Sequence, residues 1–350
     1  MDKRAKALQR ILDAGTDDKN LFGSSFALSS DSFYWEGSAG DLGTDSLYFI
    51  ASTTKLFTSA LIFQLRSEGK LKLDDKIITY LDSDVVQGLH VYKGHDYSGE
   101  LRIEHLLSHT SGLADYFQDK QGKKESLQDR LLRGEDQSWT FSEALNLGKS
   151  ISPLFAPGQK GKAHYSDLNY QLLGKIIEHI TGVSFAANCD QKIIQPLGLV
   201  HTYLYTDSLD KRPHHLYYGN KHLVIPKAMT SFGADGGMVS TSAELLIFTK
   251  AFFNGVLFPK QYIDEISIWR PIFSPLESGA GIHRFKLPWI FNPTGAVPVY
   301  IGHSGLSGAL AFYCPEKKLF IAGTVNQVAK PQLSFKTMIK LTLAATRKYE

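Results

Sequence analysis

Residues 47–65 read LYFIASTTKLFTSALIFQL and join two apolar patterns. The first five residues form a short run that favours a buried strand, and the segment from Ser52 onward predicts a long buried helix that ends near Gly69. Ser52 and Lys55 stand three residues apart, so their side chains lie on one face of this helix. A serine hydroxyl becomes a nucleophile when a base takes its proton, and a lysine in a dry cleft can be that base. The junction predicts a nucleophilic Ser52 that Lys55 activates.

The Ser-x-x-Lys spacing alone does not single out this pair. It recurs at Ser67 and Lys70 and at Ser208 and Lys211, within the polar stretches SEGK and SLDK. Both stretches are typical of a helix end or a loop. Only Ser52 stands where an apolar strand runs into a helix, so that the helix N-terminus can stabilise an oxyanion.

The composition argues against several classes of protein. The 350 residues are 43% hydrophobic and 21% charged, the proportions of an ordinary globular protein with one large or two interlocked domains. The net charge is +3, and Lys and Arg are scattered, so the sequence does not predict a nucleic-acid-binding face. No apolar run reaches the roughly 18 residues that a membrane span needs.

The N-terminus and the cysteines bear on the cellular compartment. Residues 1–15 are basic but lack the apolar core and cleavage site of a signal peptide, so we expect a cytoplasmic protein as written, or an exported one if a signal was removed. Cys189 and Cys314 lie far apart, and we expect two buried free thiols, with one disulfide as the alternative. No metal motif such as His-Glu-x-x-His occurs, and we expect neither a metal nor a cofactor.

Strand patterns gather at the two ends of the chain and helical patterns dominate the middle. Apolar residues at helical spacing predict helices at 2–14, 103–108, 140–147, 170–180, 242–253 and 332–348. Short β-branched and aromatic runs predict strands at 24–28, 33–36, 297–301, 309–314 and 319–325. A tight turn at 315–318 predicts that the last two strands form an antiparallel hairpin. The charged segment 119–137 is expected to be exposed.

This order predicts an α/β (α+β) fold. An antiparallel sheet flanked by helices would form from both chain termini, residues 1–60 and 230–350, with a mainly helical lobe, residues 61–229, inserted in it. We expect the active site in the cleft between these two lobes. The loops around 85–100, 114–140 and 204–230 would supply its walls.

A series of motifs follows Ser52 along the chain. It consists of FIASTTK at 49–55, EHLLSHTSGL at 104–113, YSDLNYQLLG at 165–174, GGMVST at 236–241 and GHSG at 302–305. In content and order, this series resembles the penicillin-recognising serine hydrolases, which include class C β-lactamases, DD-peptidases and esterases of the β-lactamase fold. The resemblance spans residues 25 to 325 and implies a β-lactamase/transpeptidase-like fold with an acyl-enzyme on Ser52.

The resemblance also implies roles for eight residues. It assigns catalysis to Ser52, Lys55, Tyr165, Asp167 and His303, and substrate binding to Ser304, Gly305 and Leu306. Tyr165 would relay a proton between Ser52 and the leaving group. The triplet Tyr-x-Asp occurs four times, but only at Tyr165 does Asn-Tyr-x-Leu-Leu-Gly follow. The backbone N–H groups of Ser52 and Leu306 would form the oxyanion hole, and Gly305 would leave room for the substrate along its strand.

Two departures from the family pattern bear on the chemistry. Asp167 stands where the lactamases carry Asn, and an ionised Asp can only accept hydrogen bonds, whereas Asn can also donate. Asp167 would favour the charged ammonium of Lys55, which in turn would lower the pKa of Tyr165 and let it share the role of base. His303 stands in place of a lysine, which removes a fixed positive charge that would bind a substrate carboxylate.

These departures favour an esterase-like or DD-peptidase-like hydrolase that acts on small esters or on peptide or amide substrates. A class C-type β-lactamase, or a penicillin-binding or sensing module that acylates without turnover, is the alternative. GHSG is also similar to part of an α/β-hydrolase nucleophile elbow, which would make Ser304 the nucleophile. That motif requires Gly-x-Ser-x-Gly, and Leu306 stands at its fifth position. The expected partner is a small-molecule or peptide substrate, and the oligomeric state is open.

Overall fold

The structure is a computed structural model that describes residues 2–17 and 19–347. Within these residues an eight-stranded antiparallel sheet has the order β10-β11-β12-β13-β14-β15-β1-β2. Its strands are β1 (Gly23–Ser30), β2 (Phe33–Gly40), β10 (Arg270–Phe273), β11 (Leu276–Ser278), β12 (His283–Phe285), β13 (Tyr300–Ser304), β14 (Ala309–Cys314) and β15 (Leu319–Thr324). The sheet therefore joins the first forty residues of the chain to its last third.

Strand β1 makes this junction because it pairs on both sides. Ser25 lies opposite Thr324 of β15 and opposite Ser38 of β2. Strands β14 and β15 form the predicted hairpin, and Lys318 completes their turn with a φ of 48°. The expectation of an antiparallel sheet formed from both termini is confirmed.

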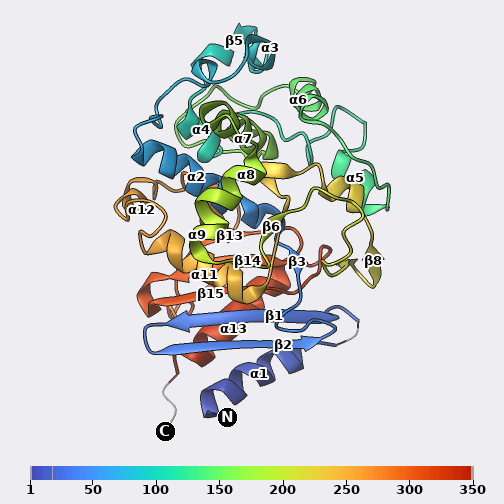
Figure 1. Cartoon of the computed structure of the whole chain (residues 1–350), viewed down its shortest axis with the longest axis vertical. Coiled ribbons are helices and arrows are strands. Elements are labelled where there is room, and N and C mark those ends of the chain that lie inside the picture. Colours follow the sequence, from blue (N-terminus) through green and yellow to red (C-terminus); the bar gives the residue numbers. More distant parts are fainter. Residues whose placement is uncertain (1, 18, 348–350) are drawn as a thin grey trace.

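Helices cover both faces of this sheet (Figure 1). Helices α1 (Lys3–Gly15) and α13 (Gln332–Ala345) pack on one face, where Phe26 and Leu28 of β1 are buried. Helix α11 (Ser242–Phe253) packs on the opposite face, to which Ala27 points. Alternate residues of a strand point to opposite faces, so β1 contributes to two separate cores.

The larger core holds the helix that directly follows the predicted nucleophile Ser52. Helix α2 (Lys55–Ser67) is buried from Lys55 to Phe63 and packs against α7 (Asp167–Thr181) within this core. Apolar residues lie on all sides of this stretch, so it is expected to be buried. The remaining helices are α3 (Ser83–Val86), α4 (Ile103–Leu107), α5 (Leu127–Leu132), α6 (Phe141–Lys149), α8 (Phe185–Cys189), α9 (Gln195–Leu197), α10 (Pro226–Met229) and α12 (Tyr262–Glu265).

Small sheets complete the fold. Strand β3 (Tyr48–Phe49) pairs with β9 (Met238–Ser240), which also pairs with β6 (Tyr203–Leu204). Two further hairpins consist of β4 (Val91–Tyr92), β5 (His95–Asp96), β7 (Leu216–Tyr218) and β8 (Lys221–Leu223). In the three-stranded sheet, the segment just before Ser52 pairs with β9, after which the chain returns to the large sheet.

Several predicted elements are corrected by the structure. The helix expected from Ser52 begins at Lys55, after a 3-10 turn at Ala51–Thr54, and the strand before it contains only Tyr48–Phe49. The segment 119–137 is not wholly exposed, because α5 buries Leu127 and Leu131. Strands β10, β11 and β12 were not predicted, since they are only three or four residues long.

Other predictions agree with the structure or lie outside it. Cys189 and Cys314 are buried and free, as expected. The last predicted helix extends to Lys348, which lies outside the described residues. The division into lobes at residues 60 and 230 stays a prediction. Across residues 2–17 and 19–347, no helix combines the length and the apolar character needed to cross a membrane.

Candidate active site

Ser52 stands in a strained junction between a strand and a helix. The N–H of Ile50 donates to the carbonyl of Met238 at 3.0 Å, and the N–H of Met238 donates to Thr54 Oγ1 at 3.1 Å. Between these anchors, Ala51 has a φ of 46°, in the left-handed region that side chains with a Cβ rarely adopt. Such strain persists where the surroundings impose it, and it is concentrated at functional sites. The anchors thus hold Ser52 in one orientation.

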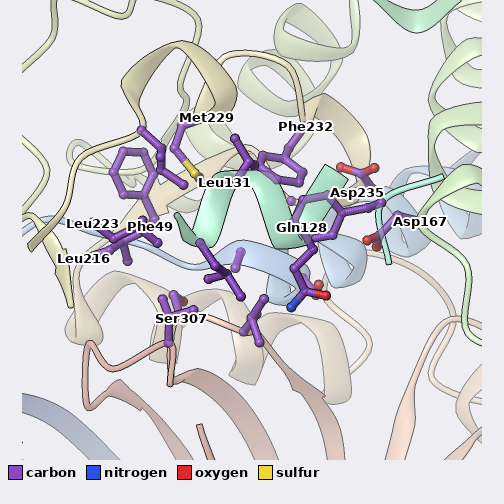
Figure 2. Close-up of a pocket in the computed structure, with 18 of the residues that line it drawn as sticks. Phe49, Gln128, Leu131, Asp167, Leu216, Leu223, Met229, Phe232, Asp235 and Ser307 are labelled. Atoms are coloured by element: carbon purple, nitrogen blue, oxygen red, sulfur yellow. The ribbon is translucent and has the colours of Figure 1, made fainter. Parts of the chain in front are cut away.

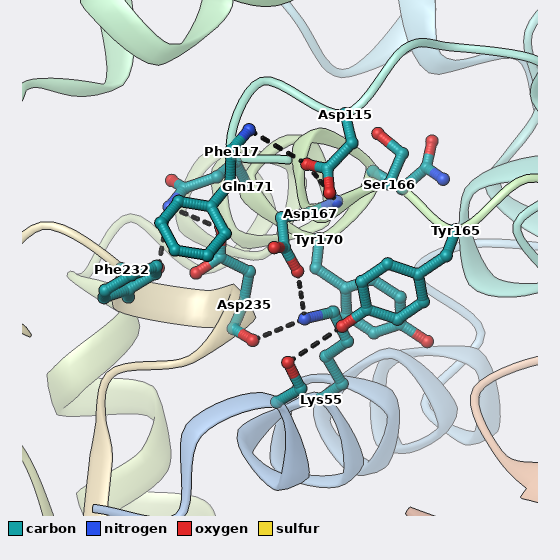
Figure 3. A network of polar contacts seen from close by, with 12 residues as sticks. Lys55, Asp115, Phe117, Tyr165, Ser166, Asp167, Tyr170, Gln171, Phe232 and Asp235 are labelled. Carbon is teal, nitrogen blue, oxygen red and sulfur yellow. Dashed lines mark hydrogen bonds and ion pairs between the residues drawn. The ribbon is translucent and has the colours of Figure 1, made fainter. Parts of the chain in front are cut away.

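Lys55 is the first residue of α2, and its side chain is completely buried. Its Nζ donates to Asp167 Oδ1 and to the carbonyl oxygen of Asp235, both at 2.6 Å (Figure 3). Asp167 is the first residue of α7. The pairing that the sequence suggested between Lys55 and Asp167 is therefore present across 112 residues of chain.

Tyr165 contacts the predicted nucleophile Ser52 directly. Its Oη donates a hydrogen bond of 2.8 Å to Ser52 Oγ, and Lys55 Nζ lies 5.0 Å from the centre of its ring. Burial raises the pKa of Tyr165 well above its ordinary value, and the negative charge of Asp167 adds to this effect. The expected lowering of its pKa by Lys55 is thus wrong in direction, because burial and the carboxylate outweigh the ammonium. Tyr165 is a neutral phenol in the free protein.

The sequence analysis missed two further carboxyl groups, those of Asp115 and Asp235. Both residues lie next to the ion pair between Lys55 and Asp167. Asp115 Oδ1 accepts hydrogen bonds from the backbone N–H groups of Asp167 and Phe117, both at 3.1 Å. Asp235 Oδ2 accepts from Tyr116 Oη at 2.8 Å and from Gln171 Nε2 at 3.2 Å. Burial, together with the charge of Asp167, raises the pKa values of Asp115 and Asp235 well above their ordinary values.

The sequence positions of Asp115 and Asp235 gave only weak evidence that these residues belong to the site. Asp115 comes two residues after the motif at 104–113, and Asp235 directly precedes the motif at 236–241. Nearness to a motif does not show that a side chain points inward. Only the folded chain brings Asp167 and Asp235 to Lys55, and Asp115 to the backbone of Asp167.

Three buried histidines lie on the other side of Tyr165. The ring of His109 stacks on that of Tyr165 with 4.6 Å between centres, and the ring of His303 stacks on that of His283 at 3.9 Å. Burial lowers the pKa values of all three, to about 3 for His283, and the charge of Lys55 lowers them further. The rings are therefore neutral. His303 Nδ1 contacts the carbonyl oxygen of Ser304 at 2.9 Å and not Ser52, Lys55 or Tyr165. The catalytic role suggested for His303 therefore stays a prediction.

Gly305 lies directly against the backbone of the nucleophile segment. A Cβ at Gly305 would stand 2.4 Å from the carbonyl oxygen of Ile50 and 3.2 Å from the N of Ser52. Only a residue without a side chain permits this close approach. The N–H of Leu306 has no backbone acceptor among the described residues, so it can serve with the N–H of Ser52 as an oxyanion donor. The predicted oxyanion pair thus lies on adjoining segments.

A pocket opens beside Ser52 (Figure 2). Its walls are mainly apolar and include Phe49, Leu131, Leu216, Leu223, Met229 and Phe232. Two of the three loops that were expected to form the walls, 114–140 and 204–230, contribute to them, and 85–100 does not; Phe49 and Phe232 lie outside these loops. Asp167, Asp235 and Leu306 also line the pocket. Among the described residues, no group of three or more His, Cys, Asp or Glu side chains is arranged to hold a metal ion.

The arrangement corresponds to that of a known family. The β-lactamase family model matches residues 8–343. This chain belongs to the β-lactamase family of serine hydrolases. The large sheet with helices from both termini is its β-lactamase/transpeptidase fold, as the motifs implied.

Members of this family with solved structures align with almost the whole chain. The D-stereospecific amidohydrolase from a Streptomyces species is 26% identical, with a TM-score of 0.77 over 95% of this chain and 97% of that one. The D-amino acid amidase from Ochrobactrum anthropi SV3, solved with D-phenylalanine, is 21% identical, with a TM-score of 0.80 over 99% of this chain and 100% of that one. At that identity, the second comparison supports the fold alone.

Curated relatives are longer than the part that this chain matches. The N-acetylmuramyl-L-alanine amidase of Bacillus subtilis (strain 168) is 26% identical over 306 residues, which are 77% of this chain and 65% of the amidase. A protein of Escherichia coli (strain K12) is 34% identical over 139 residues, which are 40% of this chain and 29% of that protein. The chain thus spans less than two thirds of the length of either relative.

Proposed function

We propose that this protein hydrolyses small esters or amides with an apolar acyl group through an acyl-enzyme on Ser52. The observation that carries the proposal is the 2.8 Å hydrogen bond between Tyr165 Oη and Ser52 Oγ beside an apolar pocket. It joins a nucleophile to the group that can move its proton. The Streptomyces relative is an amidohydrolase and the Bacillus subtilis relative an amidase, which supports amides as well as esters, whereas the Escherichia coli relative is named as a D-alanyl-D-alanine carboxypeptidase.

The proposed reaction uses Tyr165 as a neutral proton relay. Ser52 Oγ attacks the substrate carbonyl carbon and forms a C–O bond, while its proton passes to Tyr165 Oη. In the same step Tyr165 passes its own proton to the leaving oxygen or nitrogen, so that no protonated phenol forms, and the bond between the carbonyl carbon and the leaving group then breaks. Water then attacks the acyl-enzyme along the reverse route and frees Ser52 and a carboxylic acid. A neutral phenol suits this exchange because it never has to exist as a free phenolate.

The pocket favours esterase or amidase activity over carboxypeptidase activity. A carboxypeptidase must bind the free carboxylate of its substrate, for which a fixed cation is suited. His303 is neutral, and the ammonium of Lys55 already contacts Asp167 Oδ1 and the Asp235 carbonyl. The pocket walls instead provide apolar surface for the acyl group.

The test combines labelling with turnover. The protein is incubated with a fluorophosphonate, and peptide mapping identifies the labelled residue. In parallel, hydrolysis of p-nitrophenyl acetate, butyrate and octanoate is compared with that of nitrocefin. We expect label on Ser52 and turnover of the esters. Ser52→Ala should lose both, and Ser67→Ala, which changes a serine in the same spacing motif, should retain both.

Several outcomes would contradict the proposal. Label on a serine other than Ser52 would exclude the assigned nucleophile. Fast nitrocefin turnover without ester hydrolysis would indicate a β-lactamase. An acyl adduct that persists on Ser52 in a mass spectrum, with no turnover of any substrate, would indicate a binding or sensing module.

A further inference from the structure

The buried network around Lys55 contains more carboxyl groups than cations. Asp167 pairs with the ammonium of Lys55, Asp235 contacts it through its backbone carbonyl, and Asp115 contacts the backbone N–H of Asp167; each of the three aspartates is at most 4% exposed. Burying a carboxylate without a paired cation is costly. In the free protein, the raised pKa values of Asp115 and Asp235 favour their neutral, protonated forms, which reduces this cost. A ligand that brings a positive charge would reduce it in another way.

Two of these carboxyl groups have an oxygen atom without a hydrogen-bond partner among the described residues, and both residues line the pocket. Asp167 uses Oδ1 for Lys55, and its Oδ2 has no hydrogen-bond partner among the described residues. Asp235 Oδ1 is buried and also unpartnered. Both residues line the pocket beside Ser52, and Figure 2 shows them together at one end of it, with Phe49, Leu216 and Leu223 at the other. The pocket thus has an acidic end and an apolar end.

The acidic end lies close to the reacting atoms. Asp167 contacts Lys55 at 2.6 Å, and Lys55 stands one helical turn after Ser52. Only a substrate group attached close to the scissile carbonyl can reach Asp167 while that carbonyl is at Ser52. An ionised Asp accepts hydrogen bonds and does not donate them, so this group must be a donor.

We infer that the substrate carries a protonated amino group on the carbon next to the scissile carbonyl, and that Asp167 Oδ2 binds it. This inference rests on the proposed function and specifies its substrate class as aminoacyl amides or esters with an apolar side chain. The ammonium lies at the acidic end of the pocket, and the apolar side chain extends toward Phe49 and Leu223. A lactamase-type Asn at position 167 would instead suit a neutral acylamide.

The test compares substrates that differ only in this amino group. The p-nitroanilides of D-phenylalanine and of L-phenylalanine are each compared with the p-nitroanilide of 3-phenylpropanoic acid, which has the same side chain but no amino group. A charge-assisted hydrogen bond predicts that kcat/KM is about tenfold to a hundredfold higher for one phenylalanyl enantiomer at pH 7. This ratio should fall as the pH rises above about 8, where an α-amino group loses its proton.

Matched variants separate recognition from catalysis. In Asp167→Asn the ratio should drop to about one, whatever happens to the absolute rate. Asp115→Asn removes a carboxyl group of the same network that does not line the pocket, and it should keep the ratio. If Asp167→Asn has no turnover, binding of phenylalaninol and of 3-phenylpropan-1-ol to Ser52→Ala and to Ser52→Ala with Asp167→Asn gives the same comparison without chemistry.

The results distinguish this inference from the proposed function. Equal kcat/KM values for the phenylalanyl and phenylpropanoyl substrates in the wild type, or an unchanged ratio in Asp167→Asn, would overturn the inference and leave the proposed function standing. Loss of all ester and anilide hydrolysis in the wild type, with no label on Ser52, would overturn both. Preference for phenylalaninol that disappears in Asp167→Asn would support the inference from binding alone.

Discussion

Tyr165 Oη donates a hydrogen bond of 2.8 Å to Ser52 Oγ, although 113 positions separate the two residues in the chain. Replacing Tyr165 with Phe keeps the ring that stacks on His109 and removes the hydroxyl that would carry the proton. We expect kcat for ester hydrolysis to fall about a hundredfold to ten-thousandfold, because a positioned acid or base contributes this much. The melting temperature should stay close to that of the wild type. Activity within about threefold of the wild type would exclude Tyr165 as the relay.

The contact of Gly305 with the nucleophile segment predicts a steric effect on catalysis. Gly305→Ala places a Cβ 2.4 Å from the Ile50 carbonyl oxygen and 3.2 Å from the N of Ser52. The segments must move apart, which displaces the proposed oxyanion donors and lowers kcat about a hundredfold to a thousandfold. Gly99→Ala is the control, because no atom lies within 4 Å of a Cβ there. Steady-state kinetics of both variants, with thermal unfolding, checks the expectation. Equal activity of the two would contradict it.

The buried ring of His283 predicts a pH-dependent loss of stability. Burial lowers the pKa of His283 from an ordinary 6.5 to about 3. Between these values the unfolded chain binds a proton that the folded chain does not. The free energy of unfolding therefore falls as the pH falls below 6.5, by up to about 1.4 kcal/mol per pH unit for this one group.

The variant His283→Phe isolates this effect. Both ring nitrogens of His283 lack partners, so an aromatic ring without them forfeits no hydrogen bond. We expect the stability of the wild type relative to the variant to decrease from pH 7 to pH 4, as measured by urea unfolding. The raised pKa values of Asp115 and Asp235 act in the opposite direction, but these groups are present in both proteins. A difference that does not change with pH would show that His283 is not buried in neutral form.

The left-handed conformation of Ala51 predicts opposite effects on stability and activity. Ala51→Gly removes the steric cost of a φ of 46° and should raise the free energy of unfolding by up to about 1 kcal/mol. It also loosens the backbone before Ser52 and should lower kcat. Lys318→Gly is the control, since Lys318 has a φ of 48° in an exposed turn and should gain stability with unchanged kcat. A less stable Ala51→Gly protein would refute the account of strain at Ala51.

Much of the site could be predicted because its central pair is local. Ser52 and Lys55 occupy adjacent turns of one apolar segment, so their spacing already predicts that they share a face. Tyr165 and Gly305 could be found because each stands in a motif of several residues. Asp235 and His283 could not, because a single polar residue carries no periodicity and its burial depends on segments elsewhere in the chain.

The sequence by itself determined the elements with strong local patterns, the placement of Ser52 and Lys55 at one junction, and the pairing of strands from the two termini. The tertiary structure alone decided the environment of these groups. It placed the carbonyl oxygen of Asp235 against Lys55 and the carboxyl group of Asp115 against the backbone N–H of Asp167, brought α5 into the pocket wall, and raised rather than lowered the pKa of Tyr165. The physical reason is that desolvation and charge pairing depend on distances in space, whereas helix and strand patterns depend on neighbours along the chain.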